Sequence, residues 1–391
     1  MSITVLSGSP LVATPVFNKM LYKVSGSLIA QPNYRYVCDV KNPAGTTLAR
    51  LKCDKLPTTN FGFFDVQKVV ETLVAPTKPS LTQTGFVDHS GFYSGYRLDF
   101  TQEYGNTPVV TGATTTVSGV MAFAGNLEQL ELADWSLSSY FRIGSSFTNV
   151  RPLTTPTAFT VYQGGSNFLA INATKYETIV PTADWLVSAR VAYKGVNYDF
   201  AVSPSLSGTT DFNIQRFACG PANLSGTITA LSGAVEGDSY TVRFISNAAG
   251  QSDTTTFTFG PCQRFNSIPV HFVNKYGGID SYTFTMKNRK RANIEREVFG
   301  FNSDVYATTT YNKVWAGSFD YVYALNSDWL TDAESEWLIE MVRSGYVWLE
   351  LNGQLVEAVV NANQYQFVTR RNDRLTQLQI EIAVAYDNNI L

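Results

Sequence analysis

Only two histidines occur in the chain, and they are the first candidates for acid–base, nucleophilic or metal chemistry. His89 follows Asp88 in a turn rich in Gly and Ser, whereas His271 lies within a strand-like run. A catalytic triad or a metal site could recruit either ring. However, no nucleophile elbow, HExxH or CxxC pattern accompanies them. We therefore interpret His271 as an ordinary strand residue and His89 as a loop residue.

Three Asp-Trp pairs are the next candidates, because a glycoside hydrolase needs two carboxyl groups about 5 to 9.5 Å apart beside a sugar-sized cleft. They are Asp134-Trp135, Asp184-Trp185 and Asp328-Trp329. Each indole could equally anchor a core beside a turn that the aspartate caps. The sequence does not give the separation of the carboxyl groups, so we favour the structural interpretation and keep a sugar site as the alternative.

Basic residues gather at one place in the sequence, which could contact phosphates. The cluster consists of Lys287, Arg289, Lys290 and Arg291, with Arg296 nearby. Glu295 and Glu297 follow at once, and no aromatic stacking platform is interleaved with the basic residues. We expect a solvated strand end or a salt-bridged contact between subunits, and no nucleic-acid site.

Cofactor and metal motifs are missing from the sequence. No glycine is followed by lysine, which excludes a Walker A loop, and the four cysteines lack metal-ligand spacing. Cys38 and Cys53 flank an expected hairpin in which Cys38 would face about Ala49, and Cys219 and Cys262 could lie close together. We prefer buried free thiols. We expect no enzyme activity and no catalytic, cofactor-binding or metal site, and leave open only a surface calcium ion.

Length and composition bound the class of protein. A chain of 391 residues predicts two to four domains. Hydrophobic residues at 44% and charged residues at 16% exclude general disorder, and 25 Phe with 21 Tyr favour strands. A net charge of −3 gives no overall attraction to nucleic acid or anionic membrane. The sequence has no apolar run of roughly 18 residues and no secretory signal pattern, so we expect no membrane insertion and assembly in a cytoplasm.

Turn-forming clusters predict a mainly β chain of four units. Residues 1–80 are expected to form a β domain with a hairpin of strands 34–40 and 46–52, closed by a short helix that Asp65 caps and Pro76 stops. Residues 81–202 favour a β-sandwich or jelly-roll-like domain. Its clearest strands are 96–100, 158–162 and 187–193.

The third and fourth units have clearer boundaries. Residues 203–260 favour an immunoglobulin-like β domain, whose expected strands are 226–231, 240–246 and 254–259. Residues 261–391 favour an antiparallel sheet with one helix, at 332–344. Thr331 and Glu334 form a capping box before this helix, and Gly345 marks its end. Asn352-Gly353 predicts a hairpin of strands 346–351 and 354–360, and alternation predicts a closing strand at 378–386.

Residues 262–291 are expected to join the upstream strands to this last unit. They contain two strand-like runs, 268–274 and 281–287, separated by Gly277-Gly278. The pattern IPVHFVNKYGGIDSYTF within them resembles a segment of uncharacterised structural proteins of tailed phages that infect Bacteroidota, including crAss-like phages. Further matches are Tyr34-Arg35-Tyr36 with Phe63-Phe64-Asp65-Val66, and Asp328-Trp329-Leu330-Thr331-Asp332-Ala333-Glu334 with Ser344-Gly345-Tyr346-Val347-Trp348. The resemblance implies a virion component of the tail, neck or baseplate, with no catalytic residues to transfer.

Three classes of function compete at this stage. The leading hypothesis is a non-enzymatic structural protein of the virion that packs against other phage structural proteins and copies of itself, as a ring or trimer. The alternative is a carbohydrate- or receptor-binding protein at a tail tip or fibre, whose exposed Trp and Tyr would contact a host surface glycan. A polysaccharide-degrading enzyme is the third. Apolar segments at 61–64, 121–123 and 298–301 favour burial between subunits.

Overall fold

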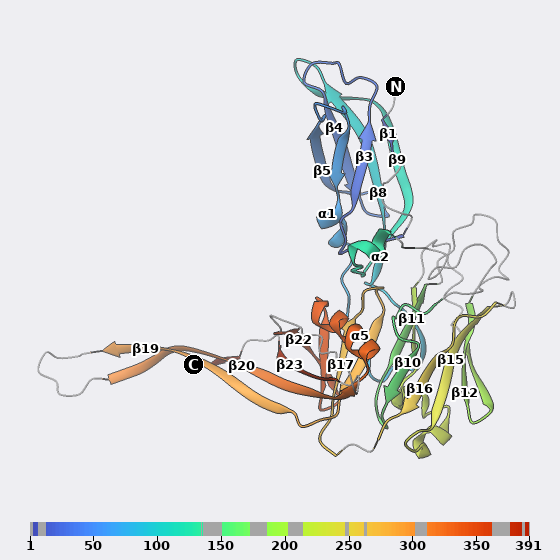
Figure 1. Ribbon diagram of the computed structural model, residues 1–391. Helices are drawn as coiled ribbons and strands as arrows, with labels where there is room; N and C mark the ends of the chain where they lie inside the picture. The colour runs from blue at the N-terminus through green and yellow to red at the C-terminus, as the bar shows by residue number, and fades with distance from the viewer. Residues whose placement is uncertain are drawn as a thin grey trace, which may run out of the picture.

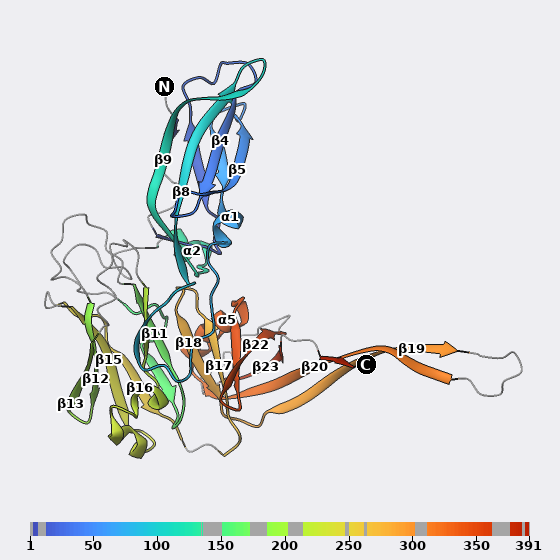
Figure 2. The same ribbon diagram turned by 180° about the vertical axis from the view of Figure 1, so that it is seen from behind.

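The computed structural model describes residues 3–6, 13–133, 135, 151–172, 186–201, 214–246, 250–261, 264–301, 311–361, 376–384 and 388–390. Within these residues the chain is mainly β, as its composition predicts. Figure 1 shows an N-terminal lobe, a sandwich lobe and a C-terminal lobe from which a long two-stranded ribbon projects. The view from behind in Figure 2 shows the N-terminal lobe standing over the place where the other two meet.

Two sheets pack face to face in the N-terminal lobe. The larger sheet contains, in order, β2 (Ala13–Pro15), β9 (Val109–Phe123), β8 (Tyr93–Tyr104), β4 (Arg35–Lys41) and β5 (Thr47–Asp54). The smaller contains β1 (Thr4–Val5), β3 (Leu21–Ser25) and β6 (Gly62–Asp65). Tyr22 of the smaller sheet contacts the ring of Phe100, and its hydroxyl lies 2.8 Å from that of Tyr96 in the larger sheet. Buried aromatic residues therefore fill the space between the sheets.

The domain boundary predicted at residue 80 is wrong. β8 and β9 complete the sheet that β4 and β5 begin, because every residue of β4 pairs with one of residues 97–103 of β8. The segment at 76–80 that suggested a linker leads to β7 (Gly85–Asp88), which pairs with β14 (Ile214–Ala218) of the sandwich lobe before the chain returns. Local composition contains no information about such pairing between distant strands.

The hairpin predicted in the first unit is confirmed, but its register and the helix cap differ from the expectation. Cys38 faces Leu51 and not Ala49, because Lys41 pairs with Thr47 instead of Thr46 and the pairing shifts by one further residue between Val40 and Lys41. The short helix α1 (Gln67–Glu71) has Val66 as its N-cap. The Asp65 carboxylate instead accepts a hydrogen bond of 3.1 Å from the Gln67 backbone N–H.

The described cysteines carry free thiols. These are Cys38, Cys53 and Cys219. Cys262, and with it the expected proximity to Cys219, lies outside the described residues.

The sandwich lobe also consists of two facing sheets. The first contains, in order, β10 (Ala158–Val161), β16 (Thr255–Phe259), β15 (Ser239–Ser246), β12 (Leu186–Tyr193) and β13 (Val196–Ala201). The second contains β11 (Phe168–Asn172), β14 and β7. Phe217 of β14 and Phe86 of β7 contact Phe244 of β15, with ring centroids 6.3 and 5.9 Å apart. The two sheets therefore share one aromatic core.

Two expectations for this region are wrong. β12, placed before the expected boundary at residue 202, pairs with β15 beyond it, so one lobe spans both units. The expected strand at 226–231 is absent from the described residues, which have the short helix α4 (Pro221–Leu224) and the 3-10 helix Thr229–Gly233 there. Pro221 favours the start of this helix, because its ring presets φ. The first residue of a helix donates no intrahelical hydrogen bond, so the missing N–H of proline costs nothing there.

The C-terminal lobe has the predicted antiparallel sheet, helix and hairpin, together with two long strands that were not predicted. Its antiparallel sheet has the order β18 (Ile279–Phe284), β17 (Ile268–Val273), β21 (Val347–Leu351), β22 (Gln354–Val360), β23 (Thr376–Val384), β20 (Tyr311–Leu330) and β19 (Arg289–Phe301), with β24 (Asn388–Ile390) also on β20. Helix α5 (Asp332–Arg343) begins at the predicted Thr331–Glu334 capping box. Asn352 and Gly353 adopt φ of 51° and 73°, as a two-residue hairpin requires.

The ribbon is the feature that the sequence did not predict. β19 pairs with residues 311–324 of β20, and we call these two segments the arm. Thirteen residues of strand extend on the order of 40 Å. Figure 1 shows the arm running far beyond the three lobes. Among the described residues, β19 pairs with β20 alone, so its outer edge faces no other strand of that part of the chain.

None of the helices in the described ranges is long and apolar enough to cross a lipid bilayer.

Candidate functional site

His89 is a buried packing residue, although it does lie in a loop as expected. Its ring stacks on Phe92 with centroids 3.6 Å apart, and Nε2 lies 3.2 Å from the Gly277 carbonyl oxygen. Burial, aided by the positive charge of Arg216, holds the pKa of His89 well below its usual value. The neutral ring therefore ties the loop after β7 to the reversal at Gly277, and no open surface surrounds it.

His271 belongs to a row of three polar residues with the composition of a catalytic triad. Its Nδ1 lies 2.7 Å from the Ser281 hydroxyl, and its Nε2 lies 3.5 Å from a Glu350 carboxylate oxygen. However, His271 is 0% exposed and Ser281 is 7% exposed, and Phe168 of the facing sheet packs its ring edge against the imidazole. A substrate carbonyl cannot reach the Ser281 hydroxyl in this position. The row joins β17, β18 and β21 inside the core.

The Asp-Trp pairs do not form a sugar cleft in the described residues. Trp135 packs between Phe123 and Tyr276, with ring centroids 5.9 Å from each. Asp134 and the pair Asp184-Trp185 lie outside the described residues. Trp329 is 53% exposed at the foot of the arm, and its backbone N–H donates to the Asp328 carboxylate. The Asp328 carboxylate is thus used for a local turn.

The turn between β17 and β18 is the place where the three lobes meet, and we call residues 274–278 the hub. The Asn274 side-chain oxygen accepts hydrogen bonds from the backbone N–H groups of Tyr276 and Gly278, which fixes the reversal. Its amide nitrogen donates to the Leu153 carbonyl oxygen of the sandwich lobe at 2.7 Å. Gly277 has a φ of 81°, as the paired glycines predict.

Close backbone approach at the hub explains its glycines. A Cβ added to Gly278 would lie 2.2 Å from the Leu153 carbonyl oxygen, and one added to Gly125 would lie 2.8 Å from the Lys275 carbonyl oxygen. The Asn126 backbone N–H donates to that same Lys275 oxygen. The N-terminal and sandwich lobes therefore both contact the hub through their backbones.

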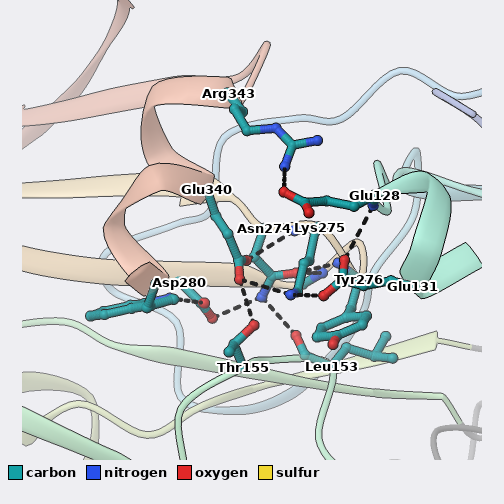
Figure 3. A network of polar contacts seen from close by, with 12 residues as sticks. Glu128, Glu131, Leu153, Thr155, Asn274, Lys275, Tyr276, Asp280, Glu340 and Arg343 are labelled. Atoms are coloured by element: carbon teal, nitrogen blue, oxygen red, sulfur yellow. Dashed lines mark hydrogen bonds and ion pairs between the residues drawn. The ribbon is translucent and has the colours of Figure 1, made fainter. Parts of the chain in front are cut away.

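A layer of charged side chains surrounds the hub (Figure 3). The Lys275 ammonium pairs with Glu131 of α2 (Gln129–Ala133) in the N-terminal lobe and lies 3.8 Å from Glu340 of α5. Arg343 of α5 pairs with Glu128 at 2.6 Å. The Thr155 hydroxyl of the sandwich lobe donates to Glu340. Each lobe thus contributes at least one partner to the layer.

Two carboxyl groups of this layer are shifted toward their protonated forms. Asp280 accepts hydrogen bonds from Trp337 Nε1 at 2.8 Å and Asn274 Nδ2 at 2.9 Å. Burial, aided by the charge of Glu340, raises the pKa of Asp280 to about 7. Burial also raises the pKa of Glu340, against the hydrogen bond from Thr155 and the contacts with Lys275. Asp280 is therefore partly protonated near neutral pH.

A cavity of about 460 Å³ opens beside the layer, between the N-terminal and C-terminal lobes. The charged side chains that line it are already paired: Lys275 with Glu340 and Glu131, Arg343 with Glu128, and Glu71 with Lys68. An ionic ligand would have to displace one of these pairs. The arrangement therefore resembles the polar filling of a domain interface more than a binding site.

Sequence reasoning missed this layer. Asp280, Glu340 and Lys275 belong to no motif, and only Gly277-Gly278 indicated that the region was special. Within the described ranges, no three His, Cys, Asp or Glu side chains gather closely enough to hold a metal ion.

Comparisons with known proteins add little to this geometry. No protein-family model matches the chain, and no curated protein matches it. Among solved structures, one match is to the fibronectin(III)-like modules of Clostridium thermocellum CbhA, with 9% identity over 66% of this chain and 93% of that one. The TM-score is 0.16, which carries no argument about shared fold or function. The immunoglobulin-like topology expected for residues 203–260 stays a prediction.

Proposed function

We propose that the chain is a non-enzymatic structural protein of a tailed-phage virion, where it assembles as a symmetric oligomer in the tail, neck or baseplate. The arm is the observation that carries the assembly part of this proposal. β24 pairs with residues 317–319 of β20 and β23 pairs with residues 322–324, so among the described residues only the outer part of the arm, beyond Glu297 and Ala316, is a two-stranded ribbon. A two-stranded ribbon is marginally stable alone, and the β19 residues at 289–298 are exposed. Such an arm gains stability when a neighbouring chain covers it. The placement in a virion rests on the resemblance of residues 268–284.

The polar residues support a structural role over a catalytic one. His271 and Ser281 are enclosed by the core, and the charges around the hub join one lobe to another. Three lobes fixed around one turn suit a building block whose surfaces must keep a constant relative orientation.

Mass spectrometry of purified particles tests the placement. We expect this chain at a stoichiometry close to that of other tail or neck components, with an abundant host cytoplasmic protein measured as the contamination control. Absence of the chain from intact particles would refute the virion role. In a density map of the particle, we expect at least one contact above about 1,000 Å² per interface.

Shortening the arm tests its role in assembly. Glu297 and Ala316 face each other across the ribbon, so residues 298–315 can be replaced by an Asn-Gly turn like that at 352–353. We expect the shortened protein to keep the far-UV circular dichroism of the lobes but to be lost from particles. Normal incorporation of a folded, shortened protein would remove the support that the arm gives to the proposal.

A second candidate, carbohydrate or receptor binding at a tail tip or fibre, is favoured by one observation. A hollow of about 310 Å³ lies at the foot of the arm, and Phe265, 40% exposed, and Tyr323 line it together with Asn266, Asn288 and Lys290. Aromatic faces flanked by amide groups are suited to sugars. A glycan array would test this, with Phe265→Ala as the variant and Trp329→Ala, outside the hollow, as the matched control. A signal lost only in Phe265→Ala would favour binding, and no signal with the wild type would exclude the glycans tested.

A further inference from the structure

We propose that β19 is a self-pairing edge, where β19 of one copy forms an antiparallel ladder with β19 of a second copy and Ile294 faces its counterpart on a two-fold axis. This inference rests on the proposed self-assembly and specifies one of its contacts. It draws on the free edge of β19, the distribution of apolar side chains on the arm, and the order of charges along the strand.

One face of the arm is richer in apolar side chains than the other, although it also carries Lys290 and Arg296. Directly paired residues of antiparallel strands lie on the same face. Ile294 pairs with Phe319 and Ala292 pairs with Tyr321, so these four residues share a face. The other face carries, along β19, Arg289, Arg291, Asn293, Glu295 and Glu297.

The apolar face of the arm is not covered by the described residues. Ile294 is 53% exposed and Val298 is 59% exposed, far more than an apolar face of a sheet inside a lobe. Near the foot of the arm the Lys290 ammonium lies 3.4 Å from the centroid of the Tyr321 ring, which covers part of that ring. Farther out, Ile294 and Val298 have no comparable cover, and a widened sheet would supply it.

No strand of the described residues pairs with the outer edge of β19, so its backbone groups can pair with a second strand. In an antiparallel ladder around a two-fold axis, opposed residues must point to the same face, and alternate residues of one strand point to opposite faces. The numbers of two opposed residues must therefore add to an even sum. One residue of β19 therefore faces the same residue of the second copy, and each possible register is identified by the number of that residue, which we call the axis residue.

The charges of β19 select one of these registers. An axis at 291, 295, 296 or 297 places a charged residue opposite itself, and an axis at 293 places Lys290 opposite Arg296. An axis at 294 places Arg291 opposite Glu297 twice and opposes no like charges. Axes at 292 and 298 also avoid like charges, but they overlap only residues 289–295 and 295–301, whereas an axis at 294 overlaps 289–299.

The same charges explain how a long edge avoids uncontrolled aggregation. Most shifted registers oppose like charges, and like charges directly opposite each other destabilise a ladder. The contact is isologous, so it joins copies in pairs. A ring or trimer of the kind expected from the sequence would be linked through its arms to a second one.

Cysteine cross-linking tests the register. In the proposed ladder two Ile294→Cys thiols face each other, within the Cα separation of about 7 Å that a disulfide needs. The matched controls on the same face are Ala292→Cys and Val298→Cys. Their thiols would lie about 13 Å and about 27 Å from their counterparts, at about 3.3 Å per residue. The wild type, with its four cysteines at positions 38, 53, 219 and 262, measures the background.

We expect mild oxidation of the full-length protein to give a covalent dimer with Ile294→Cys and only background with both controls. A dimer with Ala292→Cys or Val298→Cys in place of Ile294→Cys would overturn the register. Equal cross-linking of all three variants, or of none, would overturn the self-pairing.

Charge reversal gives a second measurement that does not require cysteine chemistry. By sedimentation equilibrium, Glu297→Arg should weaken dimerisation about tenfold or more. In the proposed ladder residue 297 of each copy faces Arg291 of the other, so the substitution creates two arginine–arginine pairs. The double variant Arg291→Glu with Glu297→Arg should restore dimerisation. Arg291 also pairs with Glu381 of its own chain, so Glu297→Arg is the cleaner single change. Dimerisation unchanged by Glu297→Arg would count against the ladder.

The contact and the virion role can fail separately. If the chain is found in particles but Ile294→Cys does not cross-link, the ladder is wrong and the structural role stands. If Ile294→Cys cross-links but the chain is missing from particles, the contact stands and the virion role is wrong.

Discussion

The pKa of Asp280 leads to the most quantitative prediction, which concerns stability and pH. Asp280 is buried at the hub and has a pKa of about 7, against 3.8 for a free side chain. Each unit of difference between the folded and unfolded pKa corresponds to about 1.4 kcal/mol. A difference of roughly three units therefore corresponds to at most roughly 4 kcal/mol of unfolding free energy.

The sign follows from proton binding. Between about pH 4 and pH 7 the folded chain holds a proton on Asp280 that the unfolded chain has released, so folding is favoured at the acidic end of this window and weakened as the pH rises through it. Below the unfolded pKa both states are protonated, and above about pH 7 both are ionised. Urea unfolding followed by tryptophan fluorescence, repeated across this window, measures the slope.

Asp280→Asn is the informative variant because its side chain does not titrate. The substitution replaces one carboxylate oxygen, which accepts a hydrogen bond from Trp337 or Asn274, with an amide group that donates, so the unfolding free energy of the variant should be lower at every pH. The decrease of unfolding free energy between about pH 4 and pH 7 that is due to Asp280 should disappear. Glu336→Gln removes an exposed carboxylate from the same lobe and should leave the slope as in the wild type. Parallel pH profiles for the wild type and Asp280→Asn would refute the assignment of a raised pKa to this buried group.

Three further substitutions, one of them with a matched control, test the local structure by urea unfolding or calorimetry. Gly353→Ala should lower the unfolding free energy by about 1 to 2 kcal/mol, because φ is 73° at this position. Gly345→Ala is the control: a Cβ has equal space there and φ is not positive, so the unfolding free energy should change by less than about 1 kcal/mol. Thr331→Ala should cost about 1 kcal/mol through loss of the capping box. Gly278→Ala should cost about 2 kcal/mol or more, because its Cβ would collide with the Leu153 carbonyl oxygen, and a neutral effect would contradict the close packing of the hub.

The features predicted correctly are those fixed by neighbours in the sequence. The capping box at Thr331, the hairpin at Asn352-Gly353 and the reversal at Gly277-Gly278 each depend on a few adjacent residues. Their backbone requirements, an N-terminal acceptor and positive φ, limit the residue types that can occur there. Such signals can be recognised without knowledge of the rest of the fold.

The domain boundaries were missed because strand partners are chosen over long distances in the sequence. β7 leaves the N-terminal lobe for the sandwich lobe, and β12 pairs across an expected boundary. The alternation of apolar residues identifies a strand and its buried face, but every strand with the same alternation is an equally acceptable neighbour. A segment that looks like a linker can therefore be a crossing between two lobes.

The layer around the hub was missed for a different reason. β18 begins at Ile279, two residues before the strand expected at 281–287, so the sequence placed Asp280 in the turn and not in the core. Asp280 is buried because β18 packs against the sandwich lobe and α5 at the same time, with Trp337 supplying the hydrogen bond that compensates its burial. Burial of this carboxyl group thus depends on the meeting of lobes.

The hub and the arm belong to one sheet, and this connects the two proposals. β17 and β18, which carry the hub, are hydrogen-bonded through β21, β22 and β23 to β20 and so to β19. Because a packed sheet transmits displacement with little compression, the contacts of Lys275, Asp280 and Glu340 also orient the arm relative to the other lobes. If β19 pairs with a second copy, the hub determines where each N-terminal lobe stands in the pair. A building block of this kind requires that its joint be rigid, and the buried carboxyl groups of Asp280 and Glu340, with their hydrogen-bond partners, supply that rigidity.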